Sequence, residues 1–273
     1  MTKIRINKKN LVIEELFEIC NSKNNFIFHN DLVKQVCVKH RFGNPFDVTK
    51  LDAKSKLPKV LVDNNYAIIH LGNGKHKFVQ GINILYHKFE PIPKKNQLLW
   101  KYKKSLLNNY NSSESNLLSV ANNQRILHNF IFGEDKEFED IDISKRPKTY
   151  FPHRTKTSFE YKFKKEKLEL KNIQIEVDLT IEFKGEVVVF EGKNGKADNF
   201  NIFQLYHPFL YYHKAKISKD LSGSITKINC TFVMREKSKD GDIIKLWAYT
   251  FTKPHDITSI KLVKCASYKL HYI

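Results

Sequence analysis

The sequence has few cysteines, and they stand apart from one another. Only four occur among 273 residues, and none belongs to a CxxC pair. Structural zinc sites normally take their ligands from two close pairs, so this spacing argues against one. Isolated cysteines instead predict buried, reduced thiols in a cytosolic protein. The four are Cys20, Cys37, Cys230 and Cys265.

Long hydrophobic runs and the common nucleotide and metal motifs are also missing. No apolar stretch approaches the roughly 20 residues that span a bilayer, so we expect no membrane partner. No apolar stretch follows the charged residues 1–10, which argues against a secretory signal. The sequence lacks a GxxxxGK[ST] loop and HExxH or HxH spacings, so we expect no nucleotide cofactor and no histidine-based metal site. These absences predict a soluble, cytoplasmic protein.

Acidic residues are scarce beside basic ones. The chain has 29 Asp and Glu against 47 Lys and Arg, a formal net charge of +18. A surplus of this size indicates a polyanionic partner, most often nucleic acid. The alternative is compositional, because an AT-rich genome raises the lysine content without selection for binding. The 20 Phe and 12 Tyr argue for a folded core.

The composition changes most clearly at residues 90–96, where two alternating prolines precede a basic pair. This segment resembles a linker and predicts two domains, residues 1–92 and residues 93–273. In the first domain we expect helices from Asn10, from Asn30 or Asp31, and from Asp47 or Thr49 to about residue 64. Pro58 lies inside the third span, so that helix is expected to be either continuous with a kink or split there. A β hairpin should follow at residues 66–79 around Gly72-Asn-Gly74.

Three helices and a hairpin are the layout of a winged helix-turn-helix, which places one helix in the major groove and the wing along the backbone. Basic residues on the third helix and the hairpin are the expected DNA contacts. The alternative is that the module binds protein and that these side chains are merely solvated. The candidates are Lys50, Lys54, Lys56, Lys59, Lys75, His76 and Lys77.

The second domain should be a mixed α/β layer structure. One long helix is expected at residues 112–133 and another at residues 199–213. Strands are expected at residues 158–163, 174–182, 186–191, 225–233 and 244–252.

Acidic residues converge where two of these strands meet. Residues 174–182 alternate strictly between apolar and polar, and the return strand 187–190 is wholly apolar, as in a strand covered on both faces. This strand ends in Glu191-Gly192-Lys193. Glu191 and Lys193 project from one face, where the hairpin can bring Asp178 beside them. The alternative is a structural hairpin with surface charges, and Glu176 and Glu182 on the Asp178 face are expected to be solvated.

Two carboxylates directed at one point repel each other and are costly to desolvate unless a cation lies between them. Mg²⁺ fits, because it takes one or two carboxylates together with waters and substrate phosphate. It can lower the pKa of its water and neutralise charge on a phosphorane-like transition state. Lys193 is then placed to orient or help deprotonate that water, or to stabilise the oxyanion. This is the chemistry of phosphodiester hydrolysis.

The spacing of Asp178 and Glu191-Gly192-Lys193, thirteen positions later, resembles the PD-(D/E)XK nuclease signature, with Val177 where a proline is usual. The helix carrying Gln204 resembles the glutamine helix of many members, and the helix from Ser112 resembles the first core helix. The resemblance covers about residues 110–252. It implies catalytic roles for Asp178, Glu191, Lys193 and Gln204, and metal ligation by Asp178, Glu191, Gly192 and Glu114. Without the resemblance, Gln204 is an ordinary polar residue of an amphipathic helix and Glu114 an acid favoured by the helix dipole.

With a winged helix before such a core, the chain looks most like a type II restriction endonuclease. That resemblance implies Mg²⁺-dependent cleavage of both strands of a short DNA sequence, with 5′-phosphate and 3′-hydroxyl ends. We expect a homodimer when cutting, because two sites related by a two-fold axis suit a palindromic target. The alternatives are a non-catalytic winged-helix DNA-binding regulator, and a methyl-dependent restriction or repair nuclease with the same core.

Overall fold

The computed structural model describes residues 7–103, 105–107, 113–133, 142, 146–218, 222–238 and 241–273. The chain forms two compact units, each described by itself below. The first, called the amino-terminal unit, comprises Met1–Lys88, Lys156–Gln174 and Asn199–Phe203. The second, called the sheet unit, comprises Phe89–Thr155, Ile175–Asp198 and Gln204–Ile273. The division at residue 92 expected from the linker stays a prediction.

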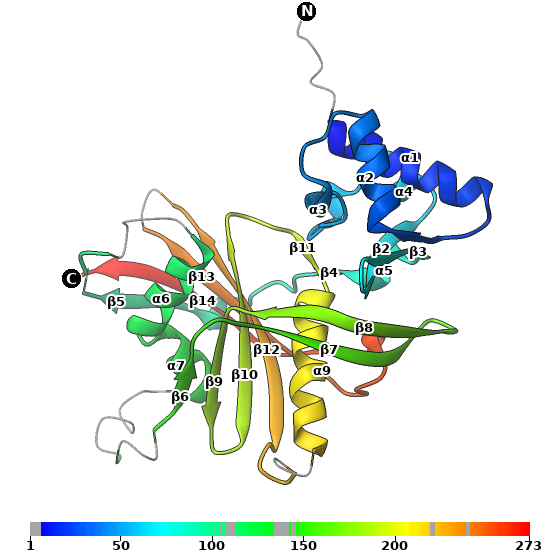
Figure 1. Ribbon diagram of the computed structural model, residues 1–273. Helices are drawn as coiled ribbons and strands as arrows, with labels where there is room; N and C mark the ends of the chain where they lie inside the picture. The colour runs from blue at the N-terminus through cyan, green and yellow to red at the C-terminus, as the bar shows by residue number, and fades with distance from the viewer. Residues whose placement is uncertain are drawn as a thin grey trace, which may run out of the picture. The chain divides into compact units, whose positions relative to one another are not determined.

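The amino-terminal unit begins with helices and a small sheet (Figure 1). Helix α1 follows its N-cap residue Asn7, so it begins earlier than expected from Asn10. The three-stranded antiparallel sheet has the order β1-β3-β2. The elements are α1 (Lys8–Ser22), β1 (Ile27–His29), α2 (Asn30–Lys39), α3 (Pro45–Val48), η1 (Lys54–Lys56), α4 (Lys59–Asp63), β2 (Tyr66–Gly72), β3 (Lys75–Gln80), α5 (Ile82–Leu85) and β4 (Tyr86–Lys88).

The third helix expected at residues 47–64 is split, as the alternative at Pro58 allowed, and the segment divides into α3, η1 and α4. Pro58 has no N–H to donate inside a helix, and it lies instead at the N-cap of α4 with extended backbone angles. The unit's core is aromatic where α1 meets the sheet. The ring of Phe17 lies 5.3 Å from that of Phe78 and 5.1 Å from that of Tyr66.

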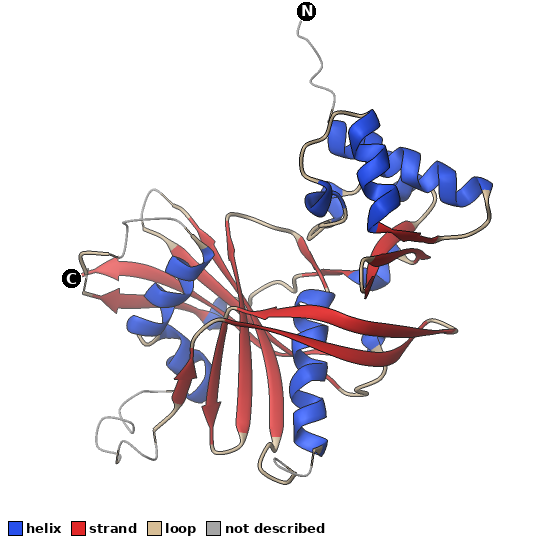
Figure 2. Cartoon of the chain, in the orientation of Figure 1, coloured by secondary structure: helices blue, strands red, loops and turns tan. Residues whose placement is uncertain are grey.

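The sheet unit contains a mixed sheet of seven strands in the order β5-β14-β13-β12-β10-β9-β6 (Figure 2). The pairs β10–β12 and β14–β5 are parallel and the others are antiparallel. This confirms a mixed α/β protein. Its elements are η2 (Lys94–Asn96), β5 (Gln97–Tyr102), α6 (Glu114–Asn123), α7 (Ile126–Phe132), β6 (Lys148–Tyr150), β9 (Leu179–Phe183), β10 (Glu186–Asn194), α9 (Phe203–Ile217), β12 (Lys227–Glu236), β13 (Ile243–Phe251), η4 (Ile257–Ser259) and β14 (Ile260–Tyr272).

Two further pairs of strands complete the fold. Strands β7 (His153–Phe163) and β8 (Glu166–Val177) form a two-stranded sheet, and β11 (Asn199–Asn201) pairs with β4. The strand expected at residues 174–182 is therefore interrupted, because a bend at Asp178 separates β8 from β9. The helix expected from residue 199 begins only at Phe203, since residues 199–201 form β11.

The long helix expected at residues 112–133 is two helices, and Ser112 lies outside the described residues. Arg125, between α6 and α7, has a left-handed φ of 60° that breaks the helical path. The Trp100 indole N–H donates to the Gln124 carbonyl at 2.9 Å, which supplies a partner at this helix end. Leu117, Leu118 and Ala121 of α6 are buried in one cluster with strand residues, so α6 is fixed against the sheet.

All four cysteines are buried and free, as the spacing predicted. None of the helices in the described part of the chain is long and apolar enough to cross a membrane.

Candidate active site

Asp178 lies at the bend between β8 and β9, beside the end of β10. The pairing of β9 with β10 runs up to Leu179 opposite Phe190, which sets the next residues, Asp178 and Glu191, at one level. The Asp178 carboxylate accepts a hydrogen bond from the Gly192 backbone N–H at 3.0 Å. The bend therefore fixes one carboxylate against the strand that carries the other.

Glu191 is held from the following helix. Gln204, the second residue of α9, donates its side-chain N–H to Glu191 Oε1 at 2.7 Å. Gln204 follows Glu191 by thirteen positions, with the short strand β11 between them, so the contact forms because the chain returns to the sheet. The hydrogen bond thus places Gln204 beside Glu191, and the supporting role that the resemblance implies for the glutamine stays a prediction.

Lys193 is paired with the first residue of α6. Its Nζ lies 2.9 Å from Glu114 Oε1, and both side chains are partly exposed. Because side chains two apart on a strand share a face, Lys193 lies on the Glu191 side of β10. The Ser113 side chain caps α6 by accepting from the Asn116 N–H at 3.1 Å, which fixes where Glu114 begins the helix.

Gly192 permits α6 to approach β10 at this point. A Cβ added there would lie 3.2 Å from Leu118 Cγ and 3.3 Å from the Glu114 carbonyl oxygen, tighter than most real Cβ contacts. The residue between Glu191 and Lys193 is thus small because a helix crosses above it. From the sequence alone, Gly192 was notable only as the residue between Glu191 and Lys193, and its contact with a helix could not be predicted.

The two central carboxylates are electrostatically strained. Burial raises the pKa of Asp178, and the charges of Glu114 and Glu176 add to this effect. Burial, followed by the charge of Asp178, raises the pKa of Glu191 well above its ordinary value. The Gln204 hydrogen bond and the Lys193 charge oppose the shift at Glu191 without cancelling it. The charge of Lys193 therefore does not offset the burial of the two carboxylates.

The donor set fits a hard divalent cation that completes its shell from elsewhere. Within residues that the structure describes, no group of three or more His, Cys, Asp or Glu side chains is arranged to hold a metal ion. Mg²⁺ commonly uses only one or two carboxylates and retains water or substrate oxygens. Asp178 and Glu191 meet that requirement. Glu114 is held by Lys193, and the Gly192 carbonyl lies on the same strand end.

The predicted DNA contacts of the amino-terminal unit differ in availability. Lys50 and Lys75 are exposed. Lys54 is half-buried and donates to the Asn83 side chain at 3.2 Å. Three others form ion pairs: Lys56 with Asp52 at 2.8 Å, Lys59 with Asp63 at 2.5 Å, and Lys77 with Glu166.

His76 is removed from this set, because it is only 6% exposed. Its ring contacts the His70 ring nitrogen at 3.0 Å and the Asn30 side chain at 2.7 Å. Burial, together with any charge on His70 and His29, lowers its pKa to about 3. His76 is thus a neutral core residue of the hairpin and lacks the exposure needed to contact a phosphate.

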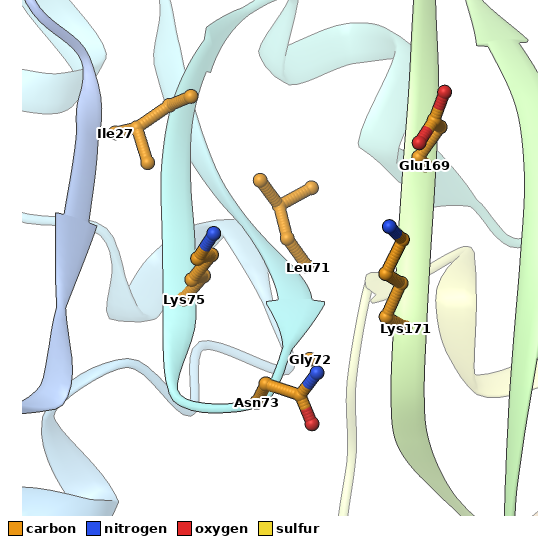
Figure 3. Close-up of a pocket in the computed structure, with 7 residues that line it drawn as sticks. All are labelled: Ile27, Leu71, Gly72, Asn73, Lys75, Glu169 and Lys171. Atoms are coloured by element: carbon orange, nitrogen blue, oxygen red, sulfur yellow. The ribbon is translucent and has the colours of Figure 1, made fainter.

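A pocket of about 210 Å³ lies in the amino-terminal unit beside the β2–β3 hairpin (Figure 3). Lys75 of β3 and Lys171 of β8 both line it, with Glu169 two residues from Lys171. Gly72 has a positive φ of 83°, and a Cβ there would lie 1.8 Å from the Lys171 carbonyl oxygen. The hairpin and β8 therefore meet backbone to backbone. The sequence did not indicate Lys171 as a candidate, because no local pattern shows that β8 lies beside the hairpin.

Comparison with known families divides the chain near the end of this hairpin. The model described as Domain of unknown function (DUF6997) matches residues 81–269, and that described as Domain of unknown function (DUF6996) matches residues 10–78. No curated protein and no solved structure matches the chain.

Proposed function

Since the chain belongs to the family described as Domain of unknown function (DUF6997), which names no activity, we propose from its site that it is a Mg²⁺-dependent DNA endonuclease of the PD-(D/E)XK type. One observation carries the proposal. Asp178 and Glu191 lie side by side at the end of β10, where burial disfavours the charge of both and the charge of Asp178 further disfavours that of Glu191. Structural carboxylates are seldom buried side by side without a cation.

The balance of charge at the site supports the binding of a cation. Asp178, Glu191 and Glu114 together carry three negative charges when ionised, against the one positive charge of Lys193. Bound Mg²⁺ would activate a water molecule and neutralise charge on the scissile phosphate. Asp178 and Glu191 would hold it, and the Gln204 hydrogen bond would keep Glu191 oriented and favour its ionised form.

Lys193 would act beside the metal ligands Asp178 and Glu191. Its ammonium group pairs with Glu114, and the residue lies on the Glu191 side of β10. That position suits orienting the attacking water and stabilising negative charge that develops on the phosphate oxygens. Glu114 is then a positioning residue that restrains the lysine from the amino end of α6.

Duplex DNA is the substrate that the remainder of the chain favours. The net charge of +18 suits a polyanion. In the amino-terminal unit, the order α1, β1, α2, short helices and hairpin, with β1 paired to β3, supports a winged helix. Exposed Lys50 and Lys75 and the pocket residue Lys171 offer phosphate contacts. We extend the proposal to sequence-specific cutting of both strands by a homodimer, as in type II restriction enzymes.

The proposal is tested by digesting genomic and plasmid DNA with purified protein, with Mg²⁺ or with EDTA. Losing a residue that only supports a metal ligand typically costs about 10–100-fold, so Asp178→Ala and Glu191→Ala should lose more than about 100-fold. Lys193→Ala should abolish turnover while retaining Mg²⁺ binding. The matched control is Glu182→Ala, which removes a carboxylate farther along β9. An Asp178→Ala protein that cuts as fast as the parent would refute the assignment.

The same variants separate the nuclease from the non-catalytic regulator. If the parent binds DNA but never cuts it with Mg²⁺ or Mn²⁺, on methylated or unmethylated DNA, the regulator replaces the proposal. Cleavage confined to methylated DNA would retain the site chemistry and change the biological class.

A further inference from the structure

Two consecutive aromatic side chains are exposed where β6 ends and the chain turns toward β7. Tyr150 ends β6 with 51% of its surface exposed, and Phe151 follows with 82% exposed. Single exposed aromatic residues are ordinary, whereas neighbouring ones followed by His153 and Arg154 form a distinct surface. Residues 150–154 are called the aromatic loop below.

The strand register puts the aromatic loop beside the carboxylates. In the antiparallel pairing of β6 with β9, Tyr150 lies opposite Thr180, two residues beyond Asp178. Strands are about 4.8 Å apart and rise about 3.3 Å per residue, so the Cα atoms of Tyr150 and Asp178 lie roughly 8 Å apart. On leaving β6, the chain continues past the level of Asp178.

The other end of the loop is tied to the same place. Arg154 Nε lies 3.2 Å from Glu176 Oε1, and Glu176 precedes Asp178 by two residues. The His153 ring lies 6.2 Å from that of Tyr211, on α9. The aromatic loop is thus anchored on both sides of the Asp178 bend and presents Phe151 outward between the anchors.

The backbone of the loop favours this outward presentation. Phe151 precedes Pro152, and a residue before proline is restricted to extended conformations. A side chain that is already held in one backbone conformation loses less freedom when it binds. Exposed aromatic rings next to basic groups are the combination that stacks on nucleobases and contacts the adjoining phosphates.

We propose that the aromatic loop is a nucleobase-binding element, in which Phe151 and Tyr150 stack on bases next to the scissile phosphate and Arg154 contacts the backbone. The inference rests on the proposed nuclease function and names the part of the DNA that this edge of the site would engage. It adds base contacts from the sheet unit itself, independent of the winged helix.

The experiment compares full-length Phe151→Ala with the parent, using fluorescein-labelled random-sequence DNA, single-stranded and duplex, in EDTA. Loss of a base-stacking aromatic weakens binding about 5- to 150-fold, and Phe151→Ala should lose affinity for the single strand within this range. The control is Leu99→Ala, which removes a side chain 62% exposed on β5, at the opposite edge of the sheet. This control should bind as the parent does.

A second variant reports stacking directly. Phe151→Trp should retain affinity, and its additional indole fluorescence should be quenched by DNA beyond any change of the parent. Full affinity in Phe151→Ala together with an unquenched indole would overturn the inference, and so would a changed oligomeric state in sedimentation with unchanged DNA binding, which would make the loop an interface between copies. Failure of the nuclease proposal would appear separately, as unimpaired cutting by Asp178→Ala.

Discussion

Replacing Gly192 by alanine should damage the site through the helix above it. The added methyl group would lie 3.2 Å from Leu118 Cγ, 3.3 Å from the Glu114 carbonyl oxygen and 3.4 Å from Leu118 Cδ1. Either α6 or β10 must move by a few tenths of an ångström. Any movement of α6 carries Glu114, whose carboxylate is 2.9 Å from Lys193 Nζ.

The size of the effect follows from two opposing contributions. Overpacking a close-packed interior typically costs about 1–3 kcal/mol. Alanine recovers about 0.5–1 kcal/mol relative to glycine within a strand, because it has less freedom to lose. The middle of each range leaves a net loss of about 1 kcal/mol, or about 2–4 °C in melting temperature for a unit of this size. A misplacement of 1 Å can cost about 100-fold in rate, so a smaller shift should cost several-fold.

Tryptophan fluorescence reports this change selectively. The chain has 2 Trp, and both Trp100 and Trp247 belong to the sheet unit. Thermal unfolding followed by this signal should shift downward for Gly192→Ala, and the rate of DNA cleavage should fall with it. Gly43→Ala is the control, because a Cβ there meets nothing within 4 Å. A Gly192→Ala protein with the parent's melting temperature and cleavage rate would refute the packing argument.

Two further predictions concern charge. Burial and the charge of Asp178 raise the pKa of Glu191 in the folded protein. Between the ordinary pKa of a glutamate and this raised pKa, the folded protein holds a proton that the unfolded chain releases. The free energy of unfolding in EDTA should therefore fall as the pH rises from the first value to the second. Glu191→Gln should flatten this dependence in urea titrations, and a parent whose stability is independent of pH above the ordinary carboxylate range would contradict it. Lys75→Ala and Lys171→Ala should each weaken binding to all DNA sequences and lower the salt slope by about one unit, measured by anisotropy at several salt concentrations. A salt dependence of binding equal to that of the parent in both variants would show that DNA does not contact these two lysines.

The hairpin at the centre of the site was predictable because its two strands have unmistakable patterns. Strict alternation before Asp178 and an apolar run before Glu191 fixed which side chains could meet, and the structure brings both together with Gln204. The ion pair of Lys193 with Glu114 depended on where α6 crosses the sheet, which no local pattern encodes. The nuclease chemistry itself stays a prediction.

The errors have local physical causes. Apolar spacing continues through Arg125, so periodicity alone could not show that α6 ends before it, whereas Pro58 itself indicated a break in the third helix. His76 was placed on the surface by its polarity. Its alternation with Phe78 along β3 already placed both on the inward face, and the histidine is buried there beside His70. Strand β14 mixes lysines with apolar residues and gave no clear signal.

The pairing of β5 with β14 has a consequence for how the sheet is assembled. Ser267 of β14 pairs with Gln97 of β5, so β5 cannot join the sheet until β14 has been synthesised. Closing so long a loop is entropically costly, and contacts between distant segments form slowly. During synthesis the strands around Asp178 and Glu191 can pair long before β14 leaves the ribosome. Until then β5 has no neighbour, and Leu98 and Leu99 lie on an open strand edge, the kind of surface that binds chaperones or other nascent chains.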